Sequence, residues 1–274
     1  MYNRCMSHSD HVQQEFKSGN AQIEVYGSRS ALGAAAAKRA AQLIQKAIEG
    51  HGQGRIIVAT GNSQLPLVEA LTKQNLDWKA VEVFHMDEYA GMGPKHSASF
   101  RHWIKTRVED VVHPGKMNYL AGDAPDLDAE MKRYSTLLNE APIDLAFVGF
   151  GENGHIAFND PPVADFDDPE TVKRVTLDEA CRRQQAGEGH FPDVASVPRE
   201  AITVTCSGLF RADAWICCVP EARKAEAVRN ALEGPISVSC PASLVRKHPR
   251  AYVYLDRESS ALLTLPVTHH LLNS

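Results

Sequence analysis

The sequence predicts a doubly wound α/β fold, in which a mostly parallel sheet carries helices on both faces. Short apolar runs alternate with helix-length segments along nearly the whole chain, and three of these runs stop abruptly at glycine and polar residues. Short apolar runs of this kind indicate strands buried on both faces, as in parallel sheets. Helices between such strands are the usual crossover connections.

The individual elements follow from the same patterns. In the segment 30–49, Leu32, Ala36, Leu43 and Ala47 recur at helical spacing. The expected helices span residues 30–49, 65–74, 98–110, 127–140 and 221–232. The expected strands span residues 56–60, 81–85, 143–150, 202–205, 215–219 and 251–255.

The chain of 274 residues is expected to form one α/β domain over residues 21–274, preceded by a loose polar arm over residues 1–20. Residues 160–200 are rich in Asp, Pro, Arg and Gly, so we predict irregular structure with at most a short helix at 177–185. A segment of this length is typical of a lid or binding loop.

Composition limits the partners of the protein. A hydrophobic share of 43% indicates a globular chain, and the net charge of -5 without a long basic run argues against nucleic acid. The start lacks a signal peptide, no apolar run is long enough to cross a membrane, and the six cysteines form no paired motif. We therefore expect a cytoplasmic protein with reduced thiols. The sequence leaves a homo-oligomer open.

Three polar clusters, TGNSQ (60–64), MDEY (86–89) and GENGH (151–155), each follow an apolar strand. The carboxyl ends of parallel strands meet at one edge of the sheet, where ligands bind. The three clusters are therefore expected to form one site.

Several residues are candidates for binding an anion at that site. Thr60, Gly61, Asn62 and Ser63 join a strand to a helix N-terminus, which favours a phosphate; an ordinary turn with a serine cap is the alternative. Lys224 lies in the first turn of a helix, where the dipole disfavours a cation, so either it faces a bound anion or it is a solvated lysine.

Arg182 and Arg183 offer a bidentate phosphate clamp or, alternatively, a charged helix face.

Two further groups are suited to proton transfer. Asp87 and Glu88 directly follow a buried strand, so each is either a base with a shifted pKa or a salt-bridged or capping acid. His155, with Asp160 five residues later, is either an oriented catalytic imidazole or a structural histidine.

A metal site is disfavoured by the spacing of the candidate ligands. There is no helical H-x-x-x-H pair and no paired-cysteine motif. The residues weighed as ligands are His85, Asp87, His96, His102 and His155.

These motifs resemble those of the glucosamine-6-phosphate deaminase/isomerase family, which has a Rossmann-like fold. The matching pieces are TGNSQ (60–64), FHMDEY (84–89), VGFGENGHIAFNDP (148–161), ARKAEAV (222–228) and LEGPISVSCPASLVRKHPRAYVYLD (232–256). Together they span residues 56–256, and the combination of the second and third pieces is specific.

The resemblance implies a role for each matching residue. Asp87 would move a proton between C2 and C1 of the opened amino sugar, His155 would assist ring opening, and Asp160 would orient His155. Gly61, Asn62, Ser63, Lys224 and Arg182 would hold the phosphate, with no metal or organic cofactor.

Asn153 departs from the pattern. Many members carry an aspartate there that supports the histidine, and asparagine cannot supply its negative charge.

The implied activity is deamination of glucosamine 6-phosphate to fructose 6-phosphate, with water consumed and ammonia released. A 6-phosphogluconolactonase-like hydrolase is the first alternative, disfavoured because lactone hydrolysis needs no proton shuttle between C2 and C1. A non-catalytic sugar-phosphate sensor is the second, disfavoured because a sensor needs neither Asp87 nor His155. The sequence does not distinguish glucosamine from galactosamine 6-phosphate.

Overall fold

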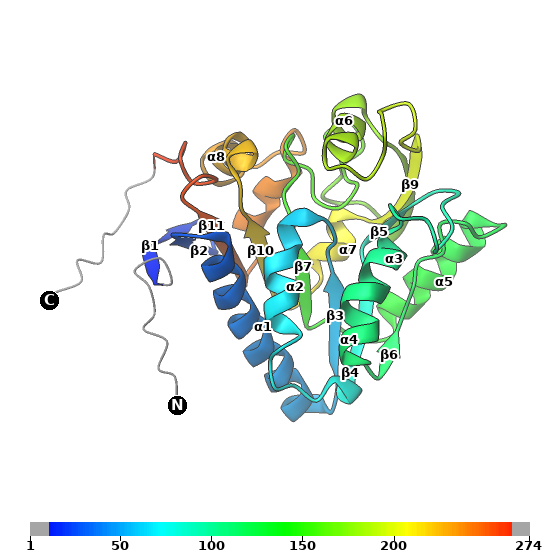
Figure 1. Cartoon of the computed structure of the whole chain (residues 1–274), viewed down its shortest axis with the longest axis horizontal. Coiled ribbons are helices and arrows are strands. Elements are labelled where there is room, and N and C mark those ends of the chain that lie inside the picture. Colours follow the sequence, from blue (N-terminus) through cyan, green and yellow to red (C-terminus); the bar gives the residue numbers. More distant parts are fainter. Residues whose placement is uncertain (1–10, 265–274) are drawn as a thin grey trace, which may run out of the picture.

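A computed structural model describes residues 11–264 and confirms the predicted fold class (Figure 1). Its eight-stranded sheet has the order β1-β2-β11-β10-β7-β3-β4-β6, and every neighbouring pair is parallel except β1 and β2. The strands of this sheet are β1 (Val12–Ser18), β2 (Ala21–Tyr26), β3 (Gly54–Val58), β4 (Val81–His85), β6 (Lys116–Met117), β7 (Leu145–Val148), β10 (Trp215–Val219) and β11 (Ala251–Asp256).

Helices cover both faces of the sheet. Helices α1 and α2 pack side by side in front of it in Figure 1, while α7 lies behind and its Leu209 carbonyl accepts a hydrogen bond from the Trp215 indole of β10. The helices are α1 (Arg29–His51), α2 (Leu65–Leu71), α3 (Phe100–Ile104), α4 (Asp110–Val112), α5 (Leu127–Asn139), α6 (Glu179–Gly187), α7 (Cys206–Phe210) and α8 (Ala225–Glu233). The expected helix over 98–110 is divided, because a π-helical segment, Lys105–Glu109, separates α3 from α4.

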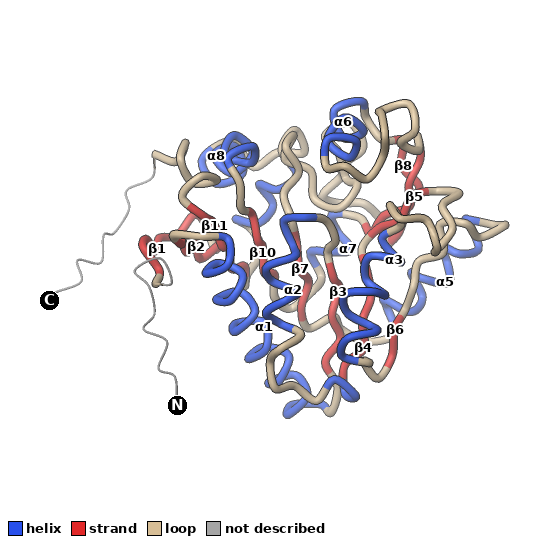
Figure 2. The backbone as a smooth tube through the Cα atoms, viewed as in Figure 1, coloured by secondary structure: helices blue, strands red, loops and turns tan. Residues whose placement is uncertain are grey.

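A second, three-stranded antiparallel sheet lies at the carboxyl edge of the first (Figure 2). It has the order β5-β9-β8, with bounds β5 (Asp87–Tyr89), β8 (Val172–Thr176) and β9 (Glu200–Val204). The prediction that residues 160–200 hold at most one short helix was therefore wrong at β8. The expected strand at 202–205 exists as β9, but it belongs to this sheet. Only Val172 and Val175 are buried in β8. Because they are three residues apart they face opposite sides of this sheet, Val172 toward the main core and Val175 toward a second hydrophobic cluster.

The prediction of a loose arm over residues 1–20 was wrong for residues 12–18, which form β1. Gly19, with a φ of 56°, and Asn20 make the two-residue connection to β2, a typical hairpin sequence. An edge strand needs only a few inward apolar residues, here Val12 and Phe16, so its composition is polar. Residues 1–10 of the predicted arm lie outside the described residues.

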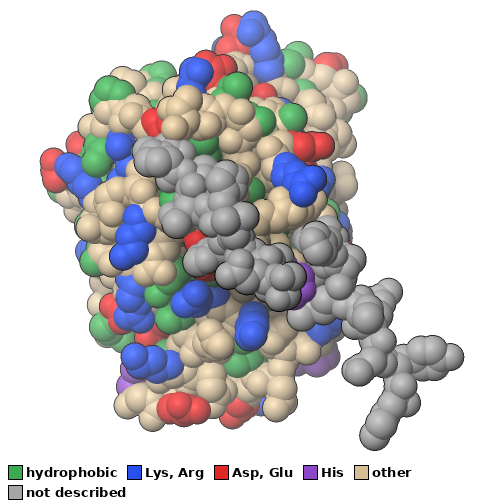
Figure 3. Space-filling model, turned by 90° about the vertical axis from the view of Figure 1, so that its left-hand side faces the viewer, with side chains coloured by type: hydrophobic (Ala, Val, Ile, Leu, Met, Phe, Trp, Pro, Cys, Tyr) green, Lys and Arg blue, Asp and Glu red, His purple; other side chains and the backbone are tan. Residues whose placement is uncertain are grey.

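The surface carries charges of both signs. On the face drawn in Figure 3, basic side chains are scattered rather than gathered into one continuous stripe. Within residues 11–264, no helix combines the length and apolarity needed to span a membrane.

Candidate active site

The carboxyl ends of β3, β4, β7 and β10 surround one cavity. Because these strands are in parallel register, the loops that follow them emerge at the same edge of the sheet. Of the predicted residues, Thr60, Gly61, Ser63, Asp87, His155 and Lys224 all line this cavity. Residues of all three polar clusters therefore line one cavity, and their role in a functional site stays a prediction.

Helix α6 lies above the carboxyl ends of the main-sheet strands (Figure 2) and contributes Gln184 and Gln185 to the wall of the cavity. The Tyr89 hydroxyl donates to Gln185 Oε1 at 2.8 Å, and the Glu152 N–H donates to Gln184 Oε1 at 2.9 Å. The enclosed volume is about 70 Å³, whereas small-molecule sites usually occupy about 300–1,000 Å³. The cavity is therefore smaller than is usual for a small-molecule site.

Asp87 enters the cavity because the chain leaves β4 at Met86 and begins β5. Its side chain is 6% exposed, and its carboxylate makes no hydrogen bond to any other residue in the described range. Burial, with a smaller effect from the charge of Glu88, raises the pKa of Asp87 well above its usual value. A buried carboxylate without hydrogen-bond donors is a strong proton acceptor when ionised.

His85 fixes the turn that presents Asp87. Its Nδ1–H donates to the Asp87 carbonyl at 2.9 Å, and its Nε2 accepts from the Leu120 N–H at 2.9 Å. These partners require one neutral tautomer, and burial lowers the pKa of His85 to about 3. Tyr134 adds support, since its hydroxyl accepts from the His85 N–H and donates to the His85 carbonyl.

The sequence left open whether Glu88 is a base or a salt-bridged or capping acid. The structure shows the second, because hydrogen bonds already occupy the Glu88 carboxylate. It accepts from the Ser99 hydroxyl at 2.6 Å and from the Arg101 N–H at 3.0 Å, next to the Arg101 guanidinium. Burial raises the pKa of Glu88, and these hydrogen bonds oppose the shift. Glu88 thus stabilises the start of α3 and leaves Asp87 as the available carboxylate.

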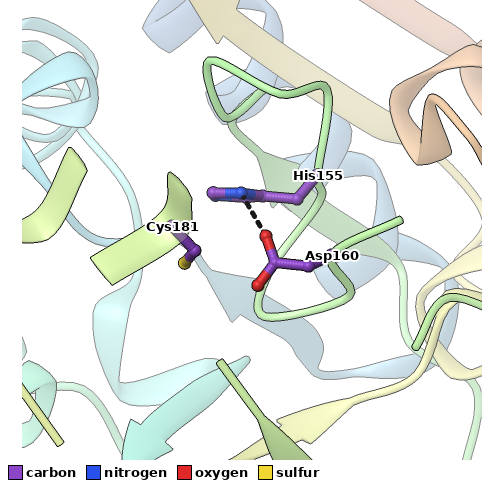
Figure 4. Close-up of side chains that lie close together, drawn as sticks. All are labelled: His155, Asp160 and Cys181. Atoms are coloured by element: carbon purple, nitrogen blue, oxygen red, sulfur yellow. Dashed lines mark ion pairs between the residues drawn. The ribbon is translucent and has the colours of Figure 1, made fainter. Parts of the chain in front are cut away.

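His155 and Asp160 form an ion pair in the loop after β7 (Figure 4). His155 Nδ1 and Asp160 Oδ1 are 2.9 Å apart, with the carboxylate to one side of the ring plane. A Cβ on Gly151 would overlap the imidazole, so the ring needs glycine at that position. Burial alone would raise the pKa of Asp160, but His155 and hydrogen bonds from Asn153 and Cys181 lower it instead.

Asn153 contacts the backbone of His155 and the carboxylate of Asp160, not the imidazole. Its Oδ1 accepts from the His155 N–H at 3.0 Å, while its Nδ2 donates to Asp160 at 2.9 Å and to Asp178 at 3.5 Å. A neutral donor between two carboxylates avoids like-charge repulsion. The amide therefore suits this loop, where an aspartate would add a third negative charge.

Cys181 of α6 completes a buried group with His155 and Asp160 (Figure 4). Their ligand-type atoms lie within 4.8 Å of one another, the one such metal-compatible group among the described residues. The His155–Asp160 pair and the thiol hydrogen bond to Asp160 already use these groups, and burial raises the pKa of the Cys181 thiol. Of the residues weighed as ligands in the sequence, His155 is the one that belongs to this group; His85, Asp87, His96 and His102 form no such group in the described part of the chain.

The loop at 60–64 presents Gly61 and Ser63 to the cavity. Gly61 has a φ of 97°, a left-handed conformation that favours glycine. Ser63 is not the helix cap considered from the sequence; its hydroxyl accepts a bond from the Gln64 side chain at 3.1 Å. Asn62 faces away from the cavity lining, and its amide donates to the Glu188 carbonyl at 3.4 Å.

Lys224 is buried in the cavity wall, not solvated. It is 2% exposed, and its ammonium makes no hydrogen bond or ion pair to another residue of the described range. Burial lowers the pKa of Lys224, and the negative charge of Glu188 is the main opposing effect. An unpaired buried cation beside Gly61 and Ser63 is the arrangement expected of an anion site.

The phosphate clamp predicted from Arg182 and Arg183 is not formed. The Arg182 guanidinium donates to the carbonyls of Val194 and Val197, outside the cavity lining. Arg183 is exposed and pairs with Glu179 on the same helix, as in the charged-face alternative.

Sequence reasoning missed Gln184, Gln185 and Glu188, which also line the cavity. The one signal was their position in the segment already interpreted as a lid or binding loop.

An α/β fold with a carboxylate, a histidine and an unpaired lysine around one cavity defines an enzyme-like site for a small anionic molecule. The chain belongs to the family described as glucosamine-6-phosphate isomerases/6-phosphogluconolactonase, whose model matches residues 27–254.

Relatives include the glucosamine-6-phosphate deaminase of Exiguobacterium sibiricum, 34% identical over 81% of this chain and 87% of that protein. Another is the enzyme of the same name from Bacillus cereus, 33% identical over 81% and 82%.

Two solved structures resemble the model. A monomeric glucosamine-6-phosphate deaminase superposes with a TM-score of 0.81 and 29% identity, covering 88% of this chain and 99% of the other. A 6-phosphogluconolactonase from Shewanella baltica superposes with a TM-score of 0.71 at 18% identity, covering 85% and 97%. The second likeness concerns the fold alone.

Proposed function

We propose that this protein is a glucosamine-6-phosphate deaminase, which converts glucosamine 6-phosphate and water to fructose 6-phosphate and ammonia. The observation that carries the proposal is the convergence of three groups on one cavity: Asp87 from β5, His155 from the loop after β7, and the unpaired Lys224 before α8. The deaminase relatives support this activity over lactone hydrolysis.

In the proposed reaction, the phosphate is anchored by the Lys224 ammonium, with Gly61 and Ser63 beside it. A group held at a distance from the reacting carbons orients them and lowers the entropic barrier. The cavity must enlarge for a hexose phosphate, and we expect α6, which supplies part of its wall, to be the element that moves. Arg182 has no role in this scheme as it is oriented here.

His155 transfers a proton from the anomeric hydroxyl to the ring oxygen, which opens the pyranose to the free aldehyde. Asp160 and Asn153 hold the histidine loop for this step. The carboxylate of Asp87 then removes the proton from C2 and returns it to C1, while O1 takes up a proton and the 2-amino group gives one up. The aldehyde carbon thereby becomes an alcohol and C2 becomes an imine. Water adds to C2, and ammonia leaves as the ketone forms.

The test is an ammonia-release assay with glucosamine 6-phosphate. We expect wild-type protein to release ammonia stoichiometrically with fructose 6-phosphate, and Asp87→Asn to lose the activity. Absence of ammonia release by the wild type would refute the deaminase proposal. Retained activity in Asp87→Asn would refute the assignment of the base. Galactosamine 6-phosphate and a 6-phosphogluconolactone serve as parallel substrates, and hydrolysis of the lactone alone would favour the lactonase alternative.

We also propose a cytoplasmic location. The proposal is supported by the adjacent, buried and unpaired thiols of Cys217 and Cys218 in β10, because reduced cysteines are typical of that compartment.

A further inference from the structure

Glu188 places a carboxylate at the same end of the cavity as Lys224. It lines the cavity with Gly61 and Ser63, and its Oε2 lies 3.7 Å from the position that a Cβ on Gly61 would occupy. The side chain is 8% exposed. A buried carboxylate therefore lies beside the loop that the proposed function assigns to the phosphate.

The charges at this end of the cavity are opposite but not in contact. Lys224 has no ion-pair partner in the described range, although Glu188 is the leading negative charge acting on it. Two buried opposite charges without a direct salt bridge leave the cation available. An incoming dianion would gain the attraction of Lys224 but meet the repulsion of Glu188.

The side chains that contact the Glu188 carboxylate are themselves partly exposed. Gln184 donates to it at 3.0 Å, Arg223 lies at 3.3 Å, and His190 Nε2 lies 3.8 Å from Oε2 of Glu188. Gly187 and Gly189 flank it, and a Cβ on either would meet no atom within 4 Å. Gly189 also has a φ of 83°. Glycines in open space allow the backbone to change conformation on both sides of the carboxylate.

We propose that Glu188 is a specificity-determining residue, a tethered anion that must leave its position beside Gly61 before a phosphate group can bind. This inference rests on the proposed function insofar as the subsite is taken to accept a phosphate. Displacement frees the end of α6, because Gln184 bonds both to Glu188 and to the Glu152 backbone. Ligands without a strong negative charge do not displace Glu188, so the site selects phosphorylated sugars.

The test compares binding of inorganic phosphate to wild type, Glu188→Gln and Glu188→Asp by titration calorimetry. Glutamine keeps the size of the side chain but removes the repelling charge, so we expect its Kd for phosphate to fall about 10-fold or more. Aspartate keeps the charge and is expected to remain near wild type. Glu179→Gln removes an exposed carboxylate from the same helix and is expected to bind phosphate as the wild type does.

Thermal unfolding first establishes that each variant is folded. Unchanged or weaker phosphate binding by Glu188→Gln would then overturn the proposal. Absence of phosphate binding by all of the proteins would overturn it as well. An equal gain in Glu179→Gln would also overturn it, because the effect would then be one of net charge. Failure of the deaminase proposal is detected separately, since ammonia release by the wild type does not enter the phosphate titration.

Discussion

Replacing Asp87 with asparagine is expected to stabilise the fold at neutral pH while abolishing activity. The side chain is buried, receives no hydrogen bond in the described range, and lies next to the buried Glu88. Ionising such a group costs free energy in the folded state that the unfolded chain does not incur. Asparagine has nearly the same shape and carries no charge, so the variant removes this cost together with the proposed base.

The size of the effect follows from linkage between protonation and folding. Because the pKa of Asp87 is raised on folding, the folded state is relatively most stable below the unfolded pKa of about 3.9. Stability is lost as pH rises toward the folded value, by about 1.4 kcal/mol for each unit by which the pKa is raised. A gain of 1 kcal/mol corresponds to about 2–4 °C in Tm for a chain of this size.

The assay is thermal unfolding of wild type and Asp87→Asn from pH 4 to pH 8. We expect similar Tm values near pH 4 and a growing advantage for the variant above it, with no ammonia release by the variant at any pH. Glu88→Gln is the matched control: it removes a neighbouring carboxylate that accepts bonds from Ser99 and Arg101, so it should lower the Tm. An Asp87→Asn variant that is less stable than wild type at pH 8 would refute the reasoning.

Two other substitutions address the phosphate and histidine ends of the site. Lys224→Met removes a buried cation without a partner in the described range. We expect the KM for glucosamine 6-phosphate to rise about 10- to 100-fold, because a hydrogen bond to a charged group is lost. We also expect the Tm to rise. An unchanged KM would exclude Lys224 from phosphate binding. Asn153→Asp adds a carboxylate beside Asp160 and Asp178. The variant should have a lower Tm and a lower kcat than wild type at pH 8, with smaller differences near pH 5. Differences that do not depend on pH would contradict the argument from charge.

Much of the main sheet could be predicted from sequence because its strands are buried on both faces. The bounds predicted for β4 and β10 match the structure, since every residue of both strands is buried and most of them are apolar. The three strands of the second sheet carry weaker signals. In β8 only Val172 and Val175 are buried, and β5 is three residues long with two acids. Such strands are defined by pairing with β9 rather than by their own composition.

Site residues that follow the end of a strand could be predicted from the sequence. Site residues whose position depends on long-range packing could not. Asp87 and His155 lie in the segments that follow buried strands β4 and β7, so their shared edge could be inferred. The orientation of Arg182 depends on carbonyl groups 12 and 15 residues further along, which no local pattern reveals. Glu188 depends in the same way on the loop after β3, which meets it only in three dimensions.

Thr203 of β9 links the two halves of the site. It pairs with Asp87 across the second sheet, and its hydroxyl accepts the Phe158 N–H at 3.1 Å in the loop that carries His155. One residue therefore contacts both the strand that carries the proposed base and the loop that carries the proposed ring-opening group. We infer that the small second sheet helps to position the two groups.

Thr203→Val tests this link, because it keeps the shape of the side chain but removes the acceptor for a buried N–H. An unsatisfied buried donor costs about 1–3 kcal/mol, so the Tm should fall. We expect kcat to fall as well, because a small displacement of His155 relative to Asp87 is costly in proton transfer. The Kd for inorganic phosphate should stay at the wild-type value, since Lys224 and Gly61 lie on other strand ends. Thr203→Ser retains the hydroxyl and should restore kcat. A Thr203→Val variant with lowered Tm but wild-type kcat would show that β9 supports the fold without setting the geometry of the site.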